Sequence, residues 1–206
     1  MNQHYLCEEI AHLVHLLPTD KALPFIRHGL ERLEKYWERV DHHRIGKYMK
    51  LMRYFLREAI NYLQHHSLPL GELEQLLQTI VLKDTSKCTM AAYSVSGVAF
   101  HVLGIYIEVL QEAGITVTHE HINWLFEMLL QSNNKEYREF IVQHVYEPAK
   151  KLFEPEDLEG LKTKVIEKAK ELENEEVRRT LYDLYGFLRA DNEPDFKVYL
   201  EKYRII

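Results

Sequence analysis

The sequence predicts an all-α protein, an irregular HEAT-like stack of antiparallel helical hairpins with about nine or ten helices. Three observations support this prediction. Apolar residues recur at helical spacing along most of the chain, the links between these stretches are short, and the 206 residues include only 8 Gly and 6 Pro. Few turn residues are typical of long helices rather than of many short strands. A compact helical bundle is the alternative architecture.

The longest predicted helix spans residues 37–64, which contain no proline and only Gly46 as a glycine. Its apolar residues share one broad side of a helical projection, which predicts a central helix against which the others pack. Asp41 lies near its start, where the carboxylate can accept a backbone hydrogen bond and pair with Arg44. The apolar side consists of Ile45, Tyr48, Leu51, Met52, Phe55, Ala59, Tyr62 and Leu63.

Two helices are predicted before this one. Leu, Ile and Val residues at helical spacing predict a helix over residues 3–17, which Pro18 ends. Thr19 is then the expected N-cap of a helix over residues 20–39. After the central helix, residues 67–69 (Ser-Leu-Pro) form a connector, and an apolar stripe from Leu70 to Val81 predicts the next helix.

A second strongly buried helix is predicted over residues 90–113, after a polar loop at residues 83–89. Its apolar residues surround most of the helix, so it should have neighbours on several sides. Gly97 and Gly104 disfavour a helix, which suggests close approach of another helix at both points. Gly114 is the expected C′ residue, because the left-handed conformation there favours glycine.

Residues 115–118 are interpreted as a connector with Thr118 capping the next helix, over residues 122–130. The polar break at residues 132–134 separates that helix from an apolar stretch ending at Pro148. A peripheral helix starts near Pro155, Asn174 is the expected cap of a helix over residues 175–188, and a short helix ends near Arg204. No linker long enough to separate domains is visible, so we expect a single α-helical domain over residues 1–206.

Composition limits the function. The net charge is −6, whereas a dedicated nucleic-acid binder is usually basic, so binding of RNA by the whole surface is not expected. The two cysteines, Cys7 and Cys88, suggest no disulfide framework. The sequence shows no signal peptide and no apolar run that spans a membrane, and we expect a soluble intracellular protein.

No set of residues predicts catalysis or a cofactor. The sequence contains no P-loop, nucleophile elbow, dinucleotide fingerprint, His-Asp dipeptide or Cys-x-x-Cys motif. Glu9-x-x-His12 matches half of a di-iron site, but a second Glu-x-x-His is absent, and we interpret the 12 histidines as ordinary ones. The sequence thus predicts no enzyme, no metal site, no cofactor and no small-molecule substrate. A helical metalloenzyme is the competing hypothesis, which elemental analysis would test.

A basic stripe lies opposite the apolar side of the central helix. Four cations on one exposed face could meet phosphates or an acidic partner, although a solvated face balanced by Glu38 and Glu58 is the simpler interpretation. Charge reversal at Lys50, Arg53 and Arg57 is expected to weaken association while leaving the fold intact. With Arg44 at the helix start, the candidate RNA- or partner-binding residues are Arg44, Lys47, Lys50, Arg53 and Arg57.

Two motifs resemble a known family. Trp37, Asp41, Arg44, Lys47, Tyr48, Leu51 and Arg53 reproduce a W-x3-D-x2-R-x2-K-[FY]-x2-L-x-R pattern. Gly97-Val98-x-x-His101, followed by Ile105, Glu108 and Leu110, looks like a second signature. Both resemble the nucleolar ribosomal RNA processing protein 1 family of eukaryotes. Residues 7–37 also look like the family, residues 124–152 match more loosely, and the last part of the chain matches least. On this resemblance, the family's earlier helices and basic tail are expected to be missing here.

The resemblance implies a non-enzymatic scaffold in the nucleus and nucleolus, required for precursor rRNA processing in large (60S) subunit assembly. It implies partners among pre-60S particle proteins and precursor rRNA, and no membrane. Arg44, Lys47 and Arg53 become candidates for contact with RNA or an acidic assembly factor. A helical-repeat adaptor outside ribosome assembly is the alternative. The residues expected to be structural are Trp37, Tyr48, Leu51, Gly97 and His101.

Overall fold

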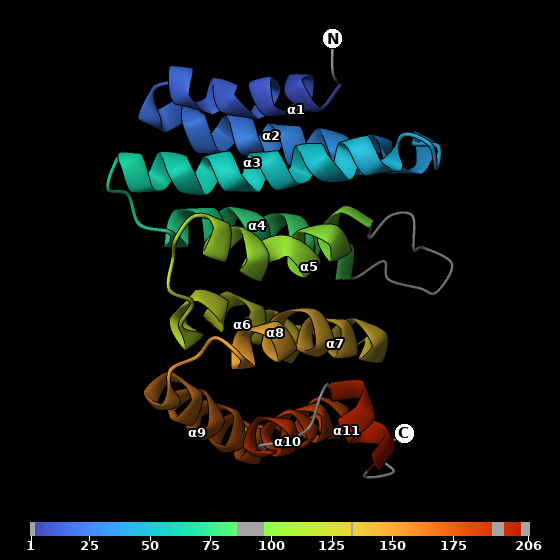
Figure 1. The fold of residues 1–206 in the computed structure, drawn as a ribbon. Coiled ribbons are helices and arrows are strands. Elements are labelled where there is room, and N and C mark those ends of the chain that lie inside the picture. Colours follow the sequence, from blue (N-terminus) through green and yellow to red (C-terminus); the bar gives the residue numbers. More distant parts are fainter. Residues whose placement is uncertain (1–2, 86–96, 133, 191–195, 203–206) are drawn as a thin grey trace. The chain divides into compact units, whose positions relative to one another are not determined.

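The computed structural model describes residues 3–85, 97–132, 134–190 and 196–202. Within these ranges the regular structure is α-helix, short 3-10 turns and one π-helical turn, and no strand occurs (Figure 1). The all-α prediction is therefore confirmed. None of the helices in these ranges is long and apolar enough to cross a membrane.

The chain divides into two compact units, residues 1–115 and residues 116–206, and each is described by itself. In the N-terminal unit, successive helices run in alternating directions (Figure 1). Helix α3 contacts α1, α2 and α5, which confirms its predicted central position. A single domain over residues 1–206 stays a prediction. The unit contains α1 (Gln3–His12), η1 (Leu13–Leu16), α2 (Thr19–Tyr36), η2 (Trp37–Arg39), α3 (Ile45–His65), α4 (Gly71–Thr85) and α5 (Gly97–Glu112).

Helix α3 begins at Ile45, so the expected start at residue 37 is wrong. A 3-10 turn over Trp37–Arg39 and extended backbone at Val40 interrupt the helical path. Asp41 then organises the new start as predicted: its carboxylate accepts a hydrogen bond from the backbone N–H of Arg44, at 3.1 Å, and pairs with the Arg44 side chain. These contacts make a corner, because they close a turn immediately before the helix.

The predicted apolar side of α3 faces inward. Phe55 and Met52 are buried, and Tyr48 and Leu51 are half-buried. The neighbouring core residues from α2, α4 and α5 include Ile26, Leu30, Leu73, Leu77, Val98, Val102, Tyr106 and Leu110. Burial of this apolar area is the main stabilising contribution to the unit.

Several helix ends differ from prediction. Helix α2 begins at Thr19 itself, with Pro18 at the cap position and no side-chain cap. Helix α4 continues to Thr85, so residues 83–85 are helical where a loop was predicted. The predicted loop residues 86–89 and the helix residues 90–96 lie outside the described residues. Gly114 is confirmed as the C′ residue, with a φ of 73° and a hydrogen bond from the Ile115 N–H to the Leu110 carbonyl.

The C-terminal unit also consists of short and medium helices. Asn174 caps α10 as predicted, because its side chain accepts hydrogen bonds from the backbone N–H groups of Glu176 and Val177. Thr118 is confirmed as a cap, in a capping box with His121. The unit contains η4 (His119–Ile122), α6 (Asn123–Gln131), α7 (Lys135–Ile141), the π turn η5 (Val142–Tyr146), α8 (Glu147–Lys150), α9 (Pro155–Glu171), α10 (Glu175–Arg189) and α11 (Phe196–Lys202).

Candidate functional site

The two sequence signatures pack directly against each other in the N-terminal unit. At one end, the indole of Trp37 lies against the backbone of Gly97 at the start of α5. A Cβ atom added to Gly97 would overlap the indole ring, and Trp37 is only 6% exposed, so the ring has little room to move. Gly97 is thus a point of close approach, but its neighbour is the indole of a 3-10 turn and not the other helix that was predicted. The burial of Trp37 fits the structural role expected of it.

A second contact follows along the same pair of helices. The ring Nε2 of His101 donates a hydrogen bond to the backbone carbonyl of Met49, at 2.9 Å. Burial lowers the pKa of His101, and the hydrogen bond to Met49 opposes this shift without reversing it. A neutral, hydrogen-bonded imidazole between α3 and α5 fits the structural role expected of His101.

Arg53 makes the third contact between the signatures. Its guanidinium donates hydrogen bonds to Glu108, at 2.8 Å, and to Glu112 on α5. The hydrogen bond that Arg53 donates to Glu112 is the main reason that the pKa of Arg53 is raised; burial opposes this shift, and the hydrogen bond to Glu108 adds to it. The Arg53 side chain is 33% exposed. Arg53 therefore joins two helices, and it is not a free cation on the surface.

Arg57 joins α3 to α1. Its guanidinium bonds to Glu8 on α1 at 2.8 Å, and to Glu58, the next residue along α3, at 2.8 and 2.9 Å. Glu58 is buried, with 5% of its surface exposed, so the simple interpretation of Glu58 as part of a solvated face is wrong. The side chain sits on the inward side of the helix because three basic groups surround its carboxylate.

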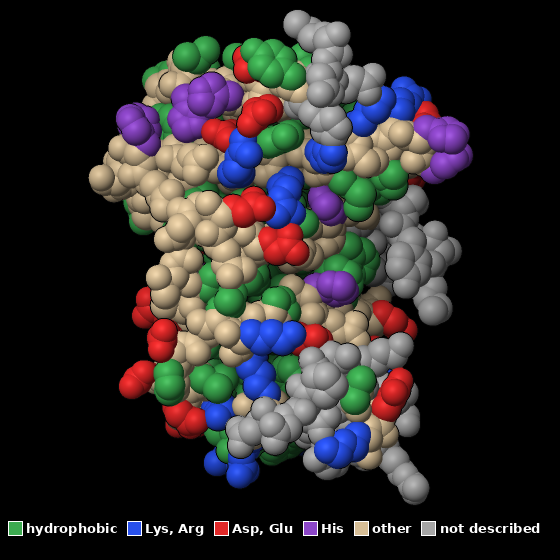
Figure 2. Space-filling view, viewed as in Figure 1, with side chains coloured by type: hydrophobic (Ala, Val, Ile, Leu, Met, Phe, Trp, Pro, Cys, Tyr) green, Lys and Arg blue, Asp and Glu red, His purple; other side chains and the backbone are tan. Residues whose placement is uncertain are grey.

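The N-terminal half of the predicted stripe, Arg44, Lys47 and Lys50, is more exposed than Arg53 and Arg57. Arg44 is exposed but paired with Asp41, and its pKa is raised mainly by the hydrogen bond to that carboxylate. Lys47 and Lys50 are exposed near Cys7 of α1. On the visible face of the N-terminal unit, Lys/Arg and Asp/Glu side chains are intermixed (Figure 2). Of the five candidates, Arg44, Lys47 and Lys50 are thus exposed, whereas Arg53 and Arg57 are half-buried.

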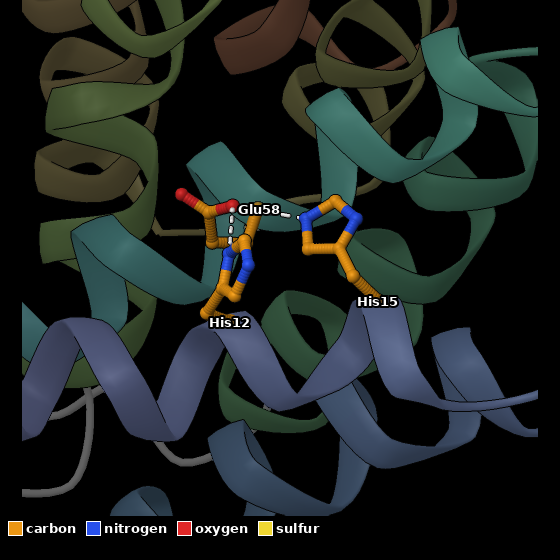
Figure 3. A group of neighbouring side chains, drawn as sticks. All are labelled: His12, His15 and Glu58. Carbon is orange, nitrogen blue, oxygen red and sulfur yellow. Dashed lines mark hydrogen bonds and ion pairs between the residues drawn. The ribbon is translucent and has the colours of Figure 1, made fainter.

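Three side chains form a group that the sequence did not reveal. His12 and His15 face the carboxylate of Glu58, with distances of 3.5 Å and 3.0 Å from their ring nitrogens to Glu58 Oε2 (Figure 3). Their ligand atoms lie within 4.8 Å of one another, a separation that a metal ion could bridge after a small closure. Sequence reasoning paired His12 with Glu9 instead, because the separation between His15 and Glu58, 43 residues, leaves no local signal.

The ion pair between Arg57 and Glu58 favours a hydrogen-bonded network over a metal site for this group. Burial raises the pKa of Glu58, but the hydrogen bonds from His15 and Arg57 outweigh it, and the net pKa is lowered. The guanidinium already supplies a positive charge to the other carboxylate oxygen, which opposes binding of a cation beside it. A hydrogen-bonded network that joins the first helices to α3 accounts for the geometry.

These contacts define an all-helical protein in which residues of the two signatures hold α3 and α5 together. The chain belongs to the family described as "Nucleolar protein, Nop52", whose model matches residues 1–185. The predicted family is therefore confirmed. The description of the family names no enzymatic activity.

Two curated relatives agree with this assignment. A mouse protein, "Ribosomal RNA processing protein 1 homolog A", is 29% identical over 115 residues, which are 55% of this chain and 23% of the relative. A human protein, "Ribosomal RNA processing protein 1 homolog B", is 29% identical over 113 residues, which are 54% of this chain and 14% of the relative. The chain thus matches less than a quarter of the length of either relative.

Proposed function

We propose that this chain is a non-enzymatic helical scaffold in ribosome biogenesis, required in the nucleolus for precursor rRNA processing during assembly of the large subunit. The observation that carries the proposal is the family match over residues 1–185 to a nucleolar family. The names of the two relatives, which refer to ribosomal RNA processing, support the same role. The proposed partners are pre-60S particle proteins and precursor rRNA.

We further propose that the exposed half of the stripe, Lys47 and Lys50 with Arg44, contacts RNA or an acidic assembly factor. Lysine ammonium groups on an exposed helix face suit phosphate oxygens, and such contacts add affinity that falls as salt rises. Arg53 and Arg57 contribute mainly by holding α5 and α1 in place, because their guanidinium groups are already bonded to Glu108, Glu112, Glu8 and Glu58.

Because Arg53 and Arg57 are bonded to other helices, the charge-reversal test should not include them. Reversal of Arg53 or Arg57 would put like charges together and disturb the packing of the helices, so loss of association would have two explanations. The variant Lys47→Glu/Lys50→Glu changes exposed side chains only. Its matched control is Lys21→Glu/Arg27→Glu on α2, two exposed cations with the same change in net charge.

The experiment is affinity purification of the tagged chain from a eukaryotic cell, followed by quantification of large-subunit precursor rRNA and proteins. We expect the wild type and the α2 control to recover these precursors, and Lys47→Glu/Lys50→Glu to recover several-fold less at an unchanged melting temperature. Equal recovery by the stripe variant would refute the role of the two lysines alone. If the wild type recovered another complex and no precursor, the adaptor function outside ribosome assembly would replace the proposal.

Contact with RNA itself needs a separate readout. Ultraviolet crosslinking in cells and sequencing of the attached RNA should give reads in the precursor of the large-subunit rRNA, and the reads should decrease in the lysine variant. Copurification of precursors without any crosslinked RNA would assign the surface to a protein partner instead.

A further inference from the structure

A cavity of about 390 Å³ lies between α2 and the first half of α3, apart from the exposed lysines of the stripe. Its apolar lining includes Leu33, Val40, Leu51 and Phe55, of which Phe55 is buried and the others are half-buried. The corner at residues 37–44 creates this space, because it separates two helices that would otherwise continue into each other. The continuous helix predicted over residues 37–64 has no such corner, so the sequence gives no sign of the cavity.

Phe55, one of the lining residues, is held in place by its packing against α2. Phe55 packs edge-on against Phe25 of α2, with ring centroids 6.0 Å apart. The ring also lies so close to α2 that a Cβ atom on Gly29 would come within 2.7 Å of two of its carbons. Since the Phe55 ring is buried and packs against both Phe25 and Gly29 of α2, it cannot readily turn to fill the opening. The site is therefore largely formed before any partner binds, as is usual for binding pockets.

The charged side chains that line the cavity are basic. Among the residues that the structure describes, Arg32, Arg39 and Arg44 line the cavity, and no Asp or Glu does. Arg32 and Arg39 are exposed and form no ion pair with any residue in the described part of the chain, whereas Arg44 pairs with Asp41. Arg39 lies over the ring of Tyr36, 5.6 Å from its centroid, and both side chains line the cavity. An occupant should thus combine apolar groups with negative charge.

The apolar lining distinguishes a peptide from a nucleobase. A base needs an open aromatic face for stacking. Tyr36 is 42% exposed, but Lys35 and Arg39 already lie over its ring. Leu33, Val40 and Leu51 are instead suited to a branched or aromatic side chain, which gains about 25 cal/mol for each Å² of apolar surface buried.

We propose that this cavity is a docking site for an acidic segment of a partner protein, which inserts a large apolar side chain between α2 and α3. Aspartate or glutamate residues on either side of that anchor pair with Arg32 and Arg39, because guanidinium groups bind carboxylates with two parallel hydrogen bonds. This mode of recognition is an apolar anchor in a groove with charged flanks. It does not depend on the proposed role in ribosome assembly.

The test uses the purified chain and a phage-displayed library of random short peptides. Selected peptides are synthesised with a fluorescent label, and their binding is measured by anisotropy. We expect the selected peptides to share a Leu, Phe, Met or Trp flanked by Asp or Glu. The variant Arg32→Glu/Arg39→Glu should weaken their binding about tenfold or more, and Val40→Trp, which fills the cavity, should do the same.

The control Lys21→Glu/Arg27→Glu should bind these peptides like the wild type, since neither side chain lines the cavity. The proposal fails if no peptide is selected above background, if the selected peptides are basic or lack an apolar anchor, or if the control weakens binding as much as the cavity variants. A labelled single-stranded RNA is measured in parallel. If the cavity variants lost affinity for RNA and kept it for the peptides, the site would belong to RNA and the proposal would be overturned.

Discussion

Replacement of Gly97 by alanine tests how the two sequence signatures fit together. The new methyl group would overlap the indole of Trp37, and the indole is 6% exposed, so either the ring or α5 must move. If the ring turned outward and exposed roughly 100 Å² of apolar surface, the cost would be about 2.5 kcal/mol at 25 cal/mol per Å². Overpacking costs in general fall in the range of about 1–3 kcal/mol. We therefore expect Gly97→Ala to destabilise the protein by about 2 kcal/mol.

The assay is thermal and denaturant unfolding followed by circular dichroism. A loss of about 2 kcal/mol corresponds to a decrease in melting temperature of roughly 4–8 °C for a protein of this size. Gly46→Ala is the matched control, because a Cβ atom there meets nothing within 4 Å. That control should be neutral or stabilising by up to about 1 kcal/mol, since alanine favours a helix more than glycine does.

A double-mutant cycle makes the test specific. In a Trp37→Leu background the new methyl group finds space, so Gly97→Ala should cost at least about 1 kcal/mol less than in the wild type. The reasoning would be refuted if Gly97→Ala were as stable as Gly46→Ala, or if the effects of Trp37→Leu and Gly97→Ala were simply additive.

Two further predictions concern carboxyl groups, the buried Glu58 and the half-buried Asp183. Glu58→Gln removes a charge bonded to Arg57 and His15, and should cost about 1–3 kcal/mol at neutral pH. The pKa of Glu58 is lowered in the folded state, so its stabilising contribution is present above the unfolded pKa of 4.5 and is lost as the pH falls through the folded pKa. The stabilities of the wild type and the variant should therefore converge in acid. A constant difference in stability at all pH values would contradict this. Burial raises the pKa of Asp183 to about 6, so the wild type loses stability as the pH rises through that value. Asp183→Asn should therefore be more stable than the wild type by about 1 kcal/mol at alkaline pH, a value reduced for the part of the side chain in solvent, and similar to it in acid. Chemical denaturation over a pH series measures both effects on stability. If Asp183→Asn were less stable than the wild type at alkaline pH, the Asp183 carboxylate would not be destabilised by burial.

The sequence predicted the helices best where the signal is local. The apolar spacing of Met52, Phe55 and Ala59 and the caps Asn174 and Gly114 depend on residues within a turn or two, so a single sequence suffices to find them. The start of α3 was misplaced because the corner before it is set by hydrogen bonds around Asp41, and the helical spacing of apolar residues continues across that corner.

Long-range contacts account for what the sequence could not predict. A helical projection places Arg53 and Arg57 on a side without apolar residues, but it cannot distinguish solvent from a neighbouring helix that offers carboxylates. The partners of Arg53 lie 55 and 59 residues away, and the α1 partner of Arg57 lies 49 residues away. Glu58 was interpreted as solvated for the same reason. Lys47 and Lys50 are exposed, as the helical projection predicts for that side of the helix.

Sedimentation of the tagged chain in a density gradient tests most directly whether it works by associating with precursors of the large ribosomal subunit. We expect the chain in cell extract to sediment with particles that contain large-subunit precursor rRNA, and to move to light fractions when rRNA synthesis is blocked. If the chain remained in light fractions, or in a particle free of precursor rRNA, whether or not rRNA was being made, the proposed function would be contradicted.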